Sequence, residues 1–234
     1  MGSAVAQVNV YHDLLLDSAG NAYLIGQRGG MTQITKKLAD GTLDVSYGKA
    51  GTFLTIPVID AQALMQEDGK LIIAGSTRNL YIFNNYLDFL VVRLNTNGSL
   101  DSSFDDDGFQ ITNFGMDDVV TSMTLQQDGK LLVAGYTTDY YLQYPYRVVA
   151  RYTSDGTMDT DFNADRPNTA ISEAYTFLTS VHSQTDGKII LGGPNNNNVF
   201  VISKLNINGD FDSSFQENGR LTTIFGWQPP STIV

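Results

Sequence analysis

Short apolar segments recur along this chain in two patterns. Residues 59–65 and 119–125 place apolar side chains mainly at alternate positions, which is the period of a half-buried β-strand. Each segment is followed by a glycine-containing turn and then by a continuous apolar stretch, at residues 71–75 and 131–135. Continuous stretches of this length predict strands covered on both faces. The pattern therefore predicts β-strands joined by tight turns.

Two further strands complete each unit. Aliphatic segments at residues 89–94, 148–152 and 199–205 predict a third strand, and residues 108–112 exemplify a fourth, more polar one. A gradient from buried inner strands to a wetter outer strand is expected for a four-stranded blade packed against its neighbours.

Two glycine-centred turns repeat with these strands. Asp-Gly and Asn-Gly favour tight hairpins, because glycine adopts positive φ freely and Asp or Asn tolerates it. The first turn occurs at residues 67–70, 127–130 and 185–188, with a weaker copy at 18–21; the second occurs at 40–47, 97–104, 155–162 and 208–215.

The repeat predicts an all-β fold: one β-propeller domain over residues 1–234, built of four four-stranded antiparallel blades. Three arrangements remain open: a closed four-bladed ring, half of an eight-bladed ring completed by a homodimer, or a piece of a longer array. End blades need covering or capping, because exposed sheet faces and edges associate. The predicted repeats are 4–56, 57–115, 116–171 and 172–226, followed by a tail at 227–234.

The string DGKLLVAGYT, continued by YRVVARYTSDGTMDTDF, resembles the bacterial delta-60 repeat. The resemblance covers nearly the whole chain and is looser in the first copy, where Gly20-Asn21 replaces Asp-Gly-Lys. It implies a β-propeller in a bacterial protein that is secreted or on the cell surface. It implies no catalytic activity.

The loops between the second and third strands predict the binding face. They are longest in the second and third copies, at residues 76–88 and 136–146, and are rich in aromatic and amide side chains. Such loops bind a glycan or peptide, or else cover the blade ends and mediate packing; both interpretations stay open. The candidate ligand-binding residues are Arg78, Tyr81, Asn84, Asn85, Tyr86, Asp139, Tyr140, Tyr141 and Tyr144.

The charge and composition exclude several partners. The formal net charge is −11 and no cluster of Lys and Arg is present, so nucleic acid is not an expected partner. No apolar run is long enough to span a bilayer as a helix. The chain contains no cysteine, which excludes disulfides and thiolate metal sites.

Catalytic and metal chemistry has little support in the sequence. His12 and His182 occupy non-equivalent places in their repeats, so no nucleophilic constellation is predicted. The acids at 101 and 105–107 suit a calcium loop or, more simply, a turn whose carboxylates accept local backbone N–H groups. We therefore predict no catalytic residue, no metal and no cofactor.

The expected function is that of a non-catalytic module that binds protein or glycan, or has a structural role. The alternative is a polysaccharide hydrolase or lyase that uses paired carboxylates at the loop-rich face. Asp117, Asp118 and Glu173 are the candidates for that alternative, since all three lie on predicted links between blades.

Overall fold

The computed structural model describes residues 10–28, 31–54, 58–78, 86–115, 117–138, 145–162, 170–174, 177–195 and 199–224. These residues form sixteen strands in four antiparallel sheets, each with its strands in sequence order. The described part of the chain contains no helix, and therefore no helix long and apolar enough to cross a membrane. The predicted all-β fold of four four-stranded blades is confirmed.

We number the sheets as blades in chain order. The first blade consists of β1 (Val10–Leu16), β2 (Ala22–Arg28), β3 (Met31–Lys37) and β4 (Thr52–Leu54). The second consists of β5 (Ile59–Met65), β6 (Leu71–Arg78), β7 (Leu87–Leu94) and β8 (Phe109–Thr112). The third consists of β9 (Asp118–Leu125), β10 (Leu131–Thr138), β11 (Pro145–Tyr152) and β12 (Ala170–Ala174). The fourth consists of β13 (Ser180–Ser183), β14 (Ile189–Pro194), β15 (Val199–Leu205) and β16 (Arg220–Ile224).

The strands follow the hydrophobic pattern closely. The predicted strand at 59–65 is β5 and that at 199–205 is β15, while β6 and β10 continue past the glycine that was expected to end them. β12 crosses the repeat boundary expected at residue 171 and pairs with β11. The division into one domain with four repeats and a tail stays a prediction.

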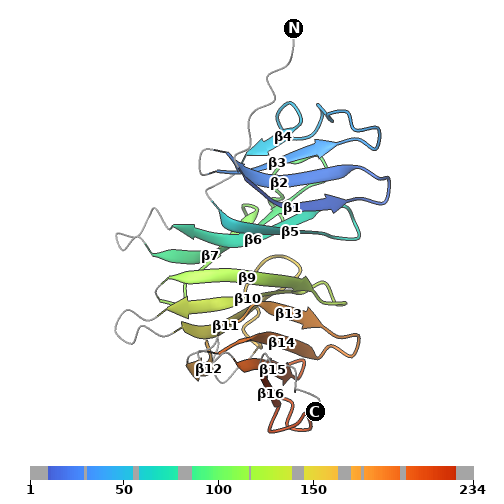
Figure 1. The fold of residues 1–234 in the computed structure, drawn as a ribbon. Coiled ribbons are helices and arrows are strands. Elements are labelled where there is room, and N and C mark those ends of the chain that lie inside the picture. The colour runs from blue at the N-terminus through green and yellow to red at the C-terminus, as the bar shows by residue number, and fades with distance from the viewer. Residues whose placement is uncertain are drawn as a thin grey trace, which may run out of the picture.

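The four blades stack face to face, and the first and fourth lie at opposite ends of the stack (Figure 1). β1 contacts β5, β5 contacts β9 and β9 contacts β13, so the first strands of successive blades lie side by side. Within the described residues the sheets do not close into a ring (Figure 1). Of the three predicted arrangements, the closed four-bladed ring is therefore not the one that this chain adopts here.

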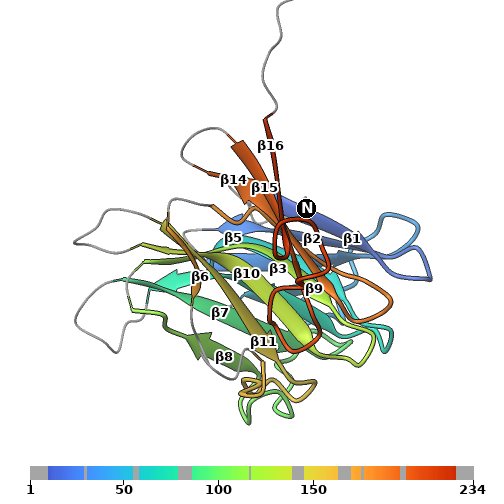
Figure 2. The ribbon, with the colours of Figure 1, turned by 90° about the horizontal axis from the view of Figure 1, so that it is seen from below.

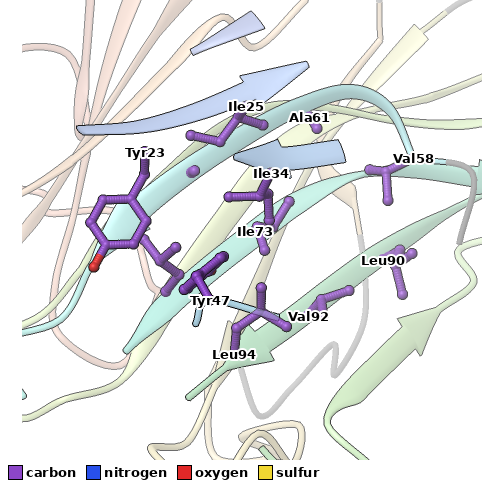
Figure 3. Close-up of a cluster of buried hydrophobic side chains, with 12 residues drawn as sticks. Tyr23, Ile25, Ile34, Tyr47, Val58, Ala61, Ile73, Leu90, Val92 and Leu94 are labelled. Carbon is purple, nitrogen blue, oxygen red and sulfur yellow. The ribbon is translucent and has the colours of Figure 1, made fainter. Parts of the chain in front are cut away.

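Three hydrophobic clusters fill the three spaces between blades. The cluster between the first and second blades joins Tyr23, Ile25 and Tyr47 to Ile73 and Val92 (Figure 3). Equivalent clusters join the second blade to the third and the third to the fourth. The apolar stretches of β6 and β10 are buried because each lies in a blade that is covered on both faces.

The first tight turns of the four blades emerge on the same side of the stack, as both views show (Figures 1 and 2). Gly20, Gly69, Gly129 and Gly187 close these turns with φ between 80° and 82°. Glycine is favoured there because this backbone region is strained for residues that carry a Cβ atom. β6 ends and β7 begins on the opposite side of the stack. The sequence places the long predicted binding loop of the second blade between these two strand ends.

Candidate functional site

The predicted binding face is described only at its base. Arg78 is the last residue of β6 and is exposed, and Tyr86 directly precedes β7 and is half-buried. The predicted ligand-binding role of these two residues stays a prediction. The other seven candidates lie outside the described residues: Tyr81, Asn84, Asn85, Asp139, Tyr140, Tyr141 and Tyr144.

Three carboxylates gather at the same end of the second and third blades. Asp88 of β7 accepts a hydrogen bond from Asn113 Nδ2 at 2.6 Å. Asp117 accepts one from the Leu87 backbone N–H at 2.9 Å, and Asp118 of β9 accepts one from the Phe114 backbone N–H at 2.6 Å. These contacts tie the link before β9 to the start of β7.

Asp118 has a pKa well above the usual range for a carboxyl group. Its side chain is fully buried, and this burial, with the nearby charges of Asp88 and Asp117, raises its pKa to about 7. A protonated carboxyl at neutral pH is a possible general acid. Asp118 is 0% exposed, however, and an acid must reach its substrate to act on it. Glu173, its predicted companion, lies in β12.

The repeated acids of the second turn are used inside the blades. Asp101 Oδ2 accepts from Lys70 Nζ at 2.9 Å and from Arg93 Nε at 2.6 Å, while its Oδ1 accepts from the Ser103 backbone N–H at 3.1 Å. Burial would raise the pKa of Asp101, but the hydrogen bonds from Lys70 and Ser103 and the Arg93 charge hold it well below its usual range.

The same arrangement recurs in the other blades. Asp159 binds Lys130 Nζ at 2.7 Å and Arg151 Nε at 2.8 Å, and Asp212 binds Lys188 Nζ at 2.7 Å. In the first blade Asp44 pairs with Lys36 at 3.1 Å. In all four blades the Oδ1 atom of this acid also accepts the backbone N–H two residues later, which confirms the predicted turn role of the repeated acids. Within the described residues no group of three or more His, Asp or Glu side chains could hold a metal ion.

A groove lies along the outer edge of the first blade. We call it the first-blade groove. Its volume is about 630 Å³. It is lined by Arg28, Gln33, Ser46, Gly48, Lys49, Thr52, Phe53, Asn97, Gly98 and Ser99. The last three belong to the second turn of the second blade, so the groove lies where two blades meet.

The groove is cationic in a strongly acidic protein. Arg28 and Lys49 line it and, among the described residues, no acid does, although the chain has 25 acids against 14 Lys and Arg. Within the described ranges neither Arg28 nor Lys49 forms an ion pair. The groove therefore offers two positive charges to an anionic group from outside.

Gln33 adds a buried amide to this groove. Its side chain donates from Nε2 to Thr35 Oγ1 at 3.1 Å. Gln33 is 3% exposed, and its Oε1 atom has no hydrogen-bond partner among the described residues. A buried acceptor without a partner is costly, and Gln33 is the buried amide of this groove. Phe53, half-buried on the same groove, supplies an apolar surface.

This groove was not predicted from the sequence. Its residues come from β2, β3, β4 and two turns that are far apart in sequence, and only the packing of the first blade against the second brings them together. The available signal was local: Arg28 and Lys49 stand in the copy that departs most from the repeat.

The repeats themselves match a known sequence family. Residues 66–104, 126–162 and 184–215 match the family described as "Domain of unknown function (DUF5122) beta-propeller". Each matched segment runs from the first turn to the aromatic residue that ends the second turn. These three segments are similar to β-propeller repeats. The finer resemblance to the delta-60 repeat stays a prediction.

Solved structures that are similar to this chain include proteins named as carbohydrate-active enzymes. A GH43_12 protein retrieved from a capybara gut metagenome has a TM-score of 0.47 and 11% identity, over 89% of this chain and 42% of that one. An endo-1,4-beta-xylanase from Bacteroides thetaiotaomicron has a TM-score of 0.44 and 12% identity, over 92% and 74%. An endo-arabinase from the same organism has a TM-score of 0.40 and 12% identity, over 97% and 80%.

This chain spans less than half the length of the first of these proteins. At such identities and TM-scores the likeness assigns no activity to this chain. The search of curated proteins gave no match.

Proposed function

We propose that this chain is a non-catalytic glycan-binding module and that the first-blade groove takes an acidic carbohydrate. The observation that carries the proposal is that two cations, Arg28 and Lys49, line one groove and form no ion pair with the described residues. A uronic acid residue has a carboxylate for Arg28 or Lys49 and hydroxyl groups for the polar lining residues Ser46 and Asn97. Sugar-binding sites commonly combine a few such polar groups with an apolar surface, which Phe53 provides here.

The rest of the polar chemistry supports a binding role over catalysis. The repeated Asp, Lys and Arg side chains are engaged with one another within the blades, and Asp118 is fully buried. The proposal includes a bacterial origin and an extracellular or cell-surface location, which the delta-60 resemblance implies. Acidic polysaccharides occur at such locations.

Isothermal titration with a uronic-acid oligosaccharide and with its neutral counterpart tests the proposal. We expect the acidic ligand to bind and the neutral one to bind at least tenfold more weakly. Lys49→Gln should reduce the affinity at least fivefold, because a charge-assisted hydrogen bond contributes about 1.5 kcal/mol or more. Lys37→Gln, the same change elsewhere in the first blade, is the matched control and should leave the affinity unchanged.

The aromatic loops are tested in parallel with the Tyr140→Ala and Tyr141→Ala double variant. Loss of binding in this variant, with Lys49→Gln unaffected, would move the site to the loop face and overturn the assignment to the groove. The absence of binding by the unaltered protein to any acidic or neutral glycan would overturn the carbohydrate function itself.

A polysaccharide hydrolase or lyase is the second candidate. It is favoured by one observation, the pKa of about 7 at Asp118 beside Asp88 and Asp117. Release of new reducing or unsaturated ends from a polysaccharide, abolished by Asp118→Asn, would establish it. Unchanged product release in Asp118→Asn would exclude this carboxyl as the acid.

A further inference from the structure

The aromatic residue at the end of each second turn packs against the next blade. Tyr47, Phe104 and Phe162 are 1%, 1% and 6% exposed. The ring of Phe104 lies against Gly156 of the third blade, where an added Cβ atom would stand 2.7 Å from Phe104 Cγ. Phe215 is the fourth member of this series and is only half-buried, and no described blade packs against it.

A backbone hydrogen bond accompanies each of the two described aromatic contacts. The N–H after Tyr47, on Gly48, donates to the Asn97 carbonyl at 2.7 Å. The N–H after Phe104, on Asp105, donates to the Asp155 carbonyl at 2.7 Å. Both carbonyls belong to the second turn of the next blade. By position, Gln216 carries the corresponding N–H in the fourth blade.

The outward face of the fourth blade has the apolar residues that form interfaces elsewhere. Ile190 follows Gly187 as Ile72 follows Gly69, and Ile202 precedes Gly209 as Val91 precedes Gly98. Ile72 and Val91 are 1% and 0% exposed in the cluster between the second and third blades. Ile190 and Ile202 are half-buried. This face therefore resembles an interface surface that lacks its neighbour.

The outward face of the first blade has the complementary features. Gly41 occupies the second turn, where Gly98 meets Tyr47 and Gly156 meets Phe104, yet nothing lies within 4 Å of the position its Cβ would take. Leu14 is 56% exposed, whereas Ala63 and Val181, at the same place in the second and fourth blades, are 8% and 6% exposed.

Leu16 and Thr35 extend this complementary face. Leu16, near the end of β1, is 66% exposed. Thr35 occupies the position of Ser203, which is fully buried between the third and fourth blades and accepts from Arg147 at 3.1 Å. A hydroxyl-bearing residue is thus compatible with an interface at this position.

The edge of the fourth blade that carries Phe215 resembles the edge of the first blade that carries Tyr47. Lys204 lies over the Phe215 ring with its Nζ 5.9 Å from the ring centroid, and Lys36 lies over the Tyr47 ring at the same distance. The second and third blades have Arg93 and Arg151 at this position. The first blade, with its lysine, packs fully against the second, so the fourth blade needs no arginine to receive a neighbour.

From these observations we infer that the fourth blade docks on the first blade of a second copy of this chain. The partner's Gly41 turn receives Phe215, and the Gln216 N–H donates to the partner's Asp40 carbonyl. The same contact in the reverse direction, related by a two-fold axis, closes eight blades into one ring. Closure buries both end faces, which otherwise remain exposed apolar surfaces.

The mass of the protein in solution tests this inference. Light scattering after size exclusion should give twice the chain mass of 25.6 kDa, with a change toward the chain mass on dilution. Leu16→Asp should give the single-chain mass, because a charge would be buried against the fourth blade. Ile207→Asp alters a residue that is 56% exposed in a fourth-blade turn, and this control should keep the doubled mass.

A cross-link tests the geometry independently of stability. The chain contains no cysteine, so the Asp40→Cys and Gln216→Cys double variant introduces the only thiols. Oxidation should give a covalent dimer on denaturing gels, whereas the Asp40→Cys and Ile207→Cys pair should not. A single-chain mass at every concentration, a mass larger than two chains, or equal cross-linking of both pairs would overturn the two-chain ring.

Discussion

The ring of Tyr47 in the first blade lies directly on Gly98 of the second blade. An added Cβ atom at Gly98 would stand 2.9 Å from Tyr47 Cζ. The glycine that turns one hairpin thus also leaves the space that the preceding blade fills. Phe104 and Gly156 repeat this contact between the second and third blades, so one residue type serves both the turn and the stacking.

Substitution of Gly156 by alanine should therefore be unusually destabilising. The Cβ atom would overlap the Phe104 ring, and the φ of +92° adds backbone strain. We expect a loss of about 2–4 kcal/mol in the free energy of unfolding, measured by chemical denaturation. Gly129→Ala is the control, because Gly129 has φ +82° but only an ordinary 3.5 Å contact. It should lose about 1–2 kcal/mol; an equal loss in both variants would contradict the packing role of Gly156.

The carboxylate of Asp159 should be essential to the third blade. Asp159→Asn removes the charge that Lys130 and Arg151 share, and leaves the guanidinium of Arg151, itself 5% exposed, without its counter-ion. Breaking a buried pair in this way costs about 3–5 kcal/mol. Asp186→Asn, at an exposed turn, should cost less than about 1 kcal/mol. Thermal unfolding of the two variants compares them directly.

Acid should unfold the protein through the repeated turn carboxylates. Hydrogen bonds from Lys188 and Ser214 lower the pKa of Asp212 to about 2, and the pKa values of Asp101 and Asp159 are also lowered. An acid with a lowered pKa stabilises the fold above its unfolded value, near 4, and this contribution is lost as the pH falls toward the folded value. We expect a steep loss of stability between about pH 4 and pH 2. High salt at pH 7 should have a much smaller effect.

Asp118 should make the fold less stable as the pH rises. Burial raises its pKa to about 7, so the folded protein holds a proton that the unfolded chain releases near pH 4. Its contribution to stability is therefore complete below about pH 4 and is lost as the pH rises to about 7, by up to about 1.4 kcal/mol for each pH unit. Asp118→Asn should remove this decline in a pH series of denaturation curves. An unchanged pH profile in the variant would show that another group titrates.

Part of the candidate site could be predicted from sequence and part could not. Loop length and aromatic content are local properties, and they pointed to the segments around Tyr81 and Tyr140. The first-blade groove depends on Lys49 and Asn97 being neighbours across two blades. No periodicity reports that contact, because it arises only when the sheets stack.

The carboxylates show the same division. The recurrence of Asp101 and Asp159 in equivalent turns indicated a structural role, and their hydrogen bonds to local backbone N–H groups confirm it. Each of these carboxylates also accepts hydrogen bonds from a turn lysine and a strand arginine, which was not predicted. Residues such as Lys70 and Asp101 are brought together only by the pairing of β6 with β7.

The sequence by itself determined the blade: alternating and continuous apolar strands, joined by glycine turns, have only one way to hydrogen-bond locally and to bury their faces. Tertiary structure alone decided how the blades stack, which acids are buried, and where the cations remain unpaired. It also showed that the described residues of the first and fourth blades do not meet (Figure 1). The physical reason is that strand pairing is set by neighbours in sequence, whereas stacking and ring closure depend on the summed shape of whole faces.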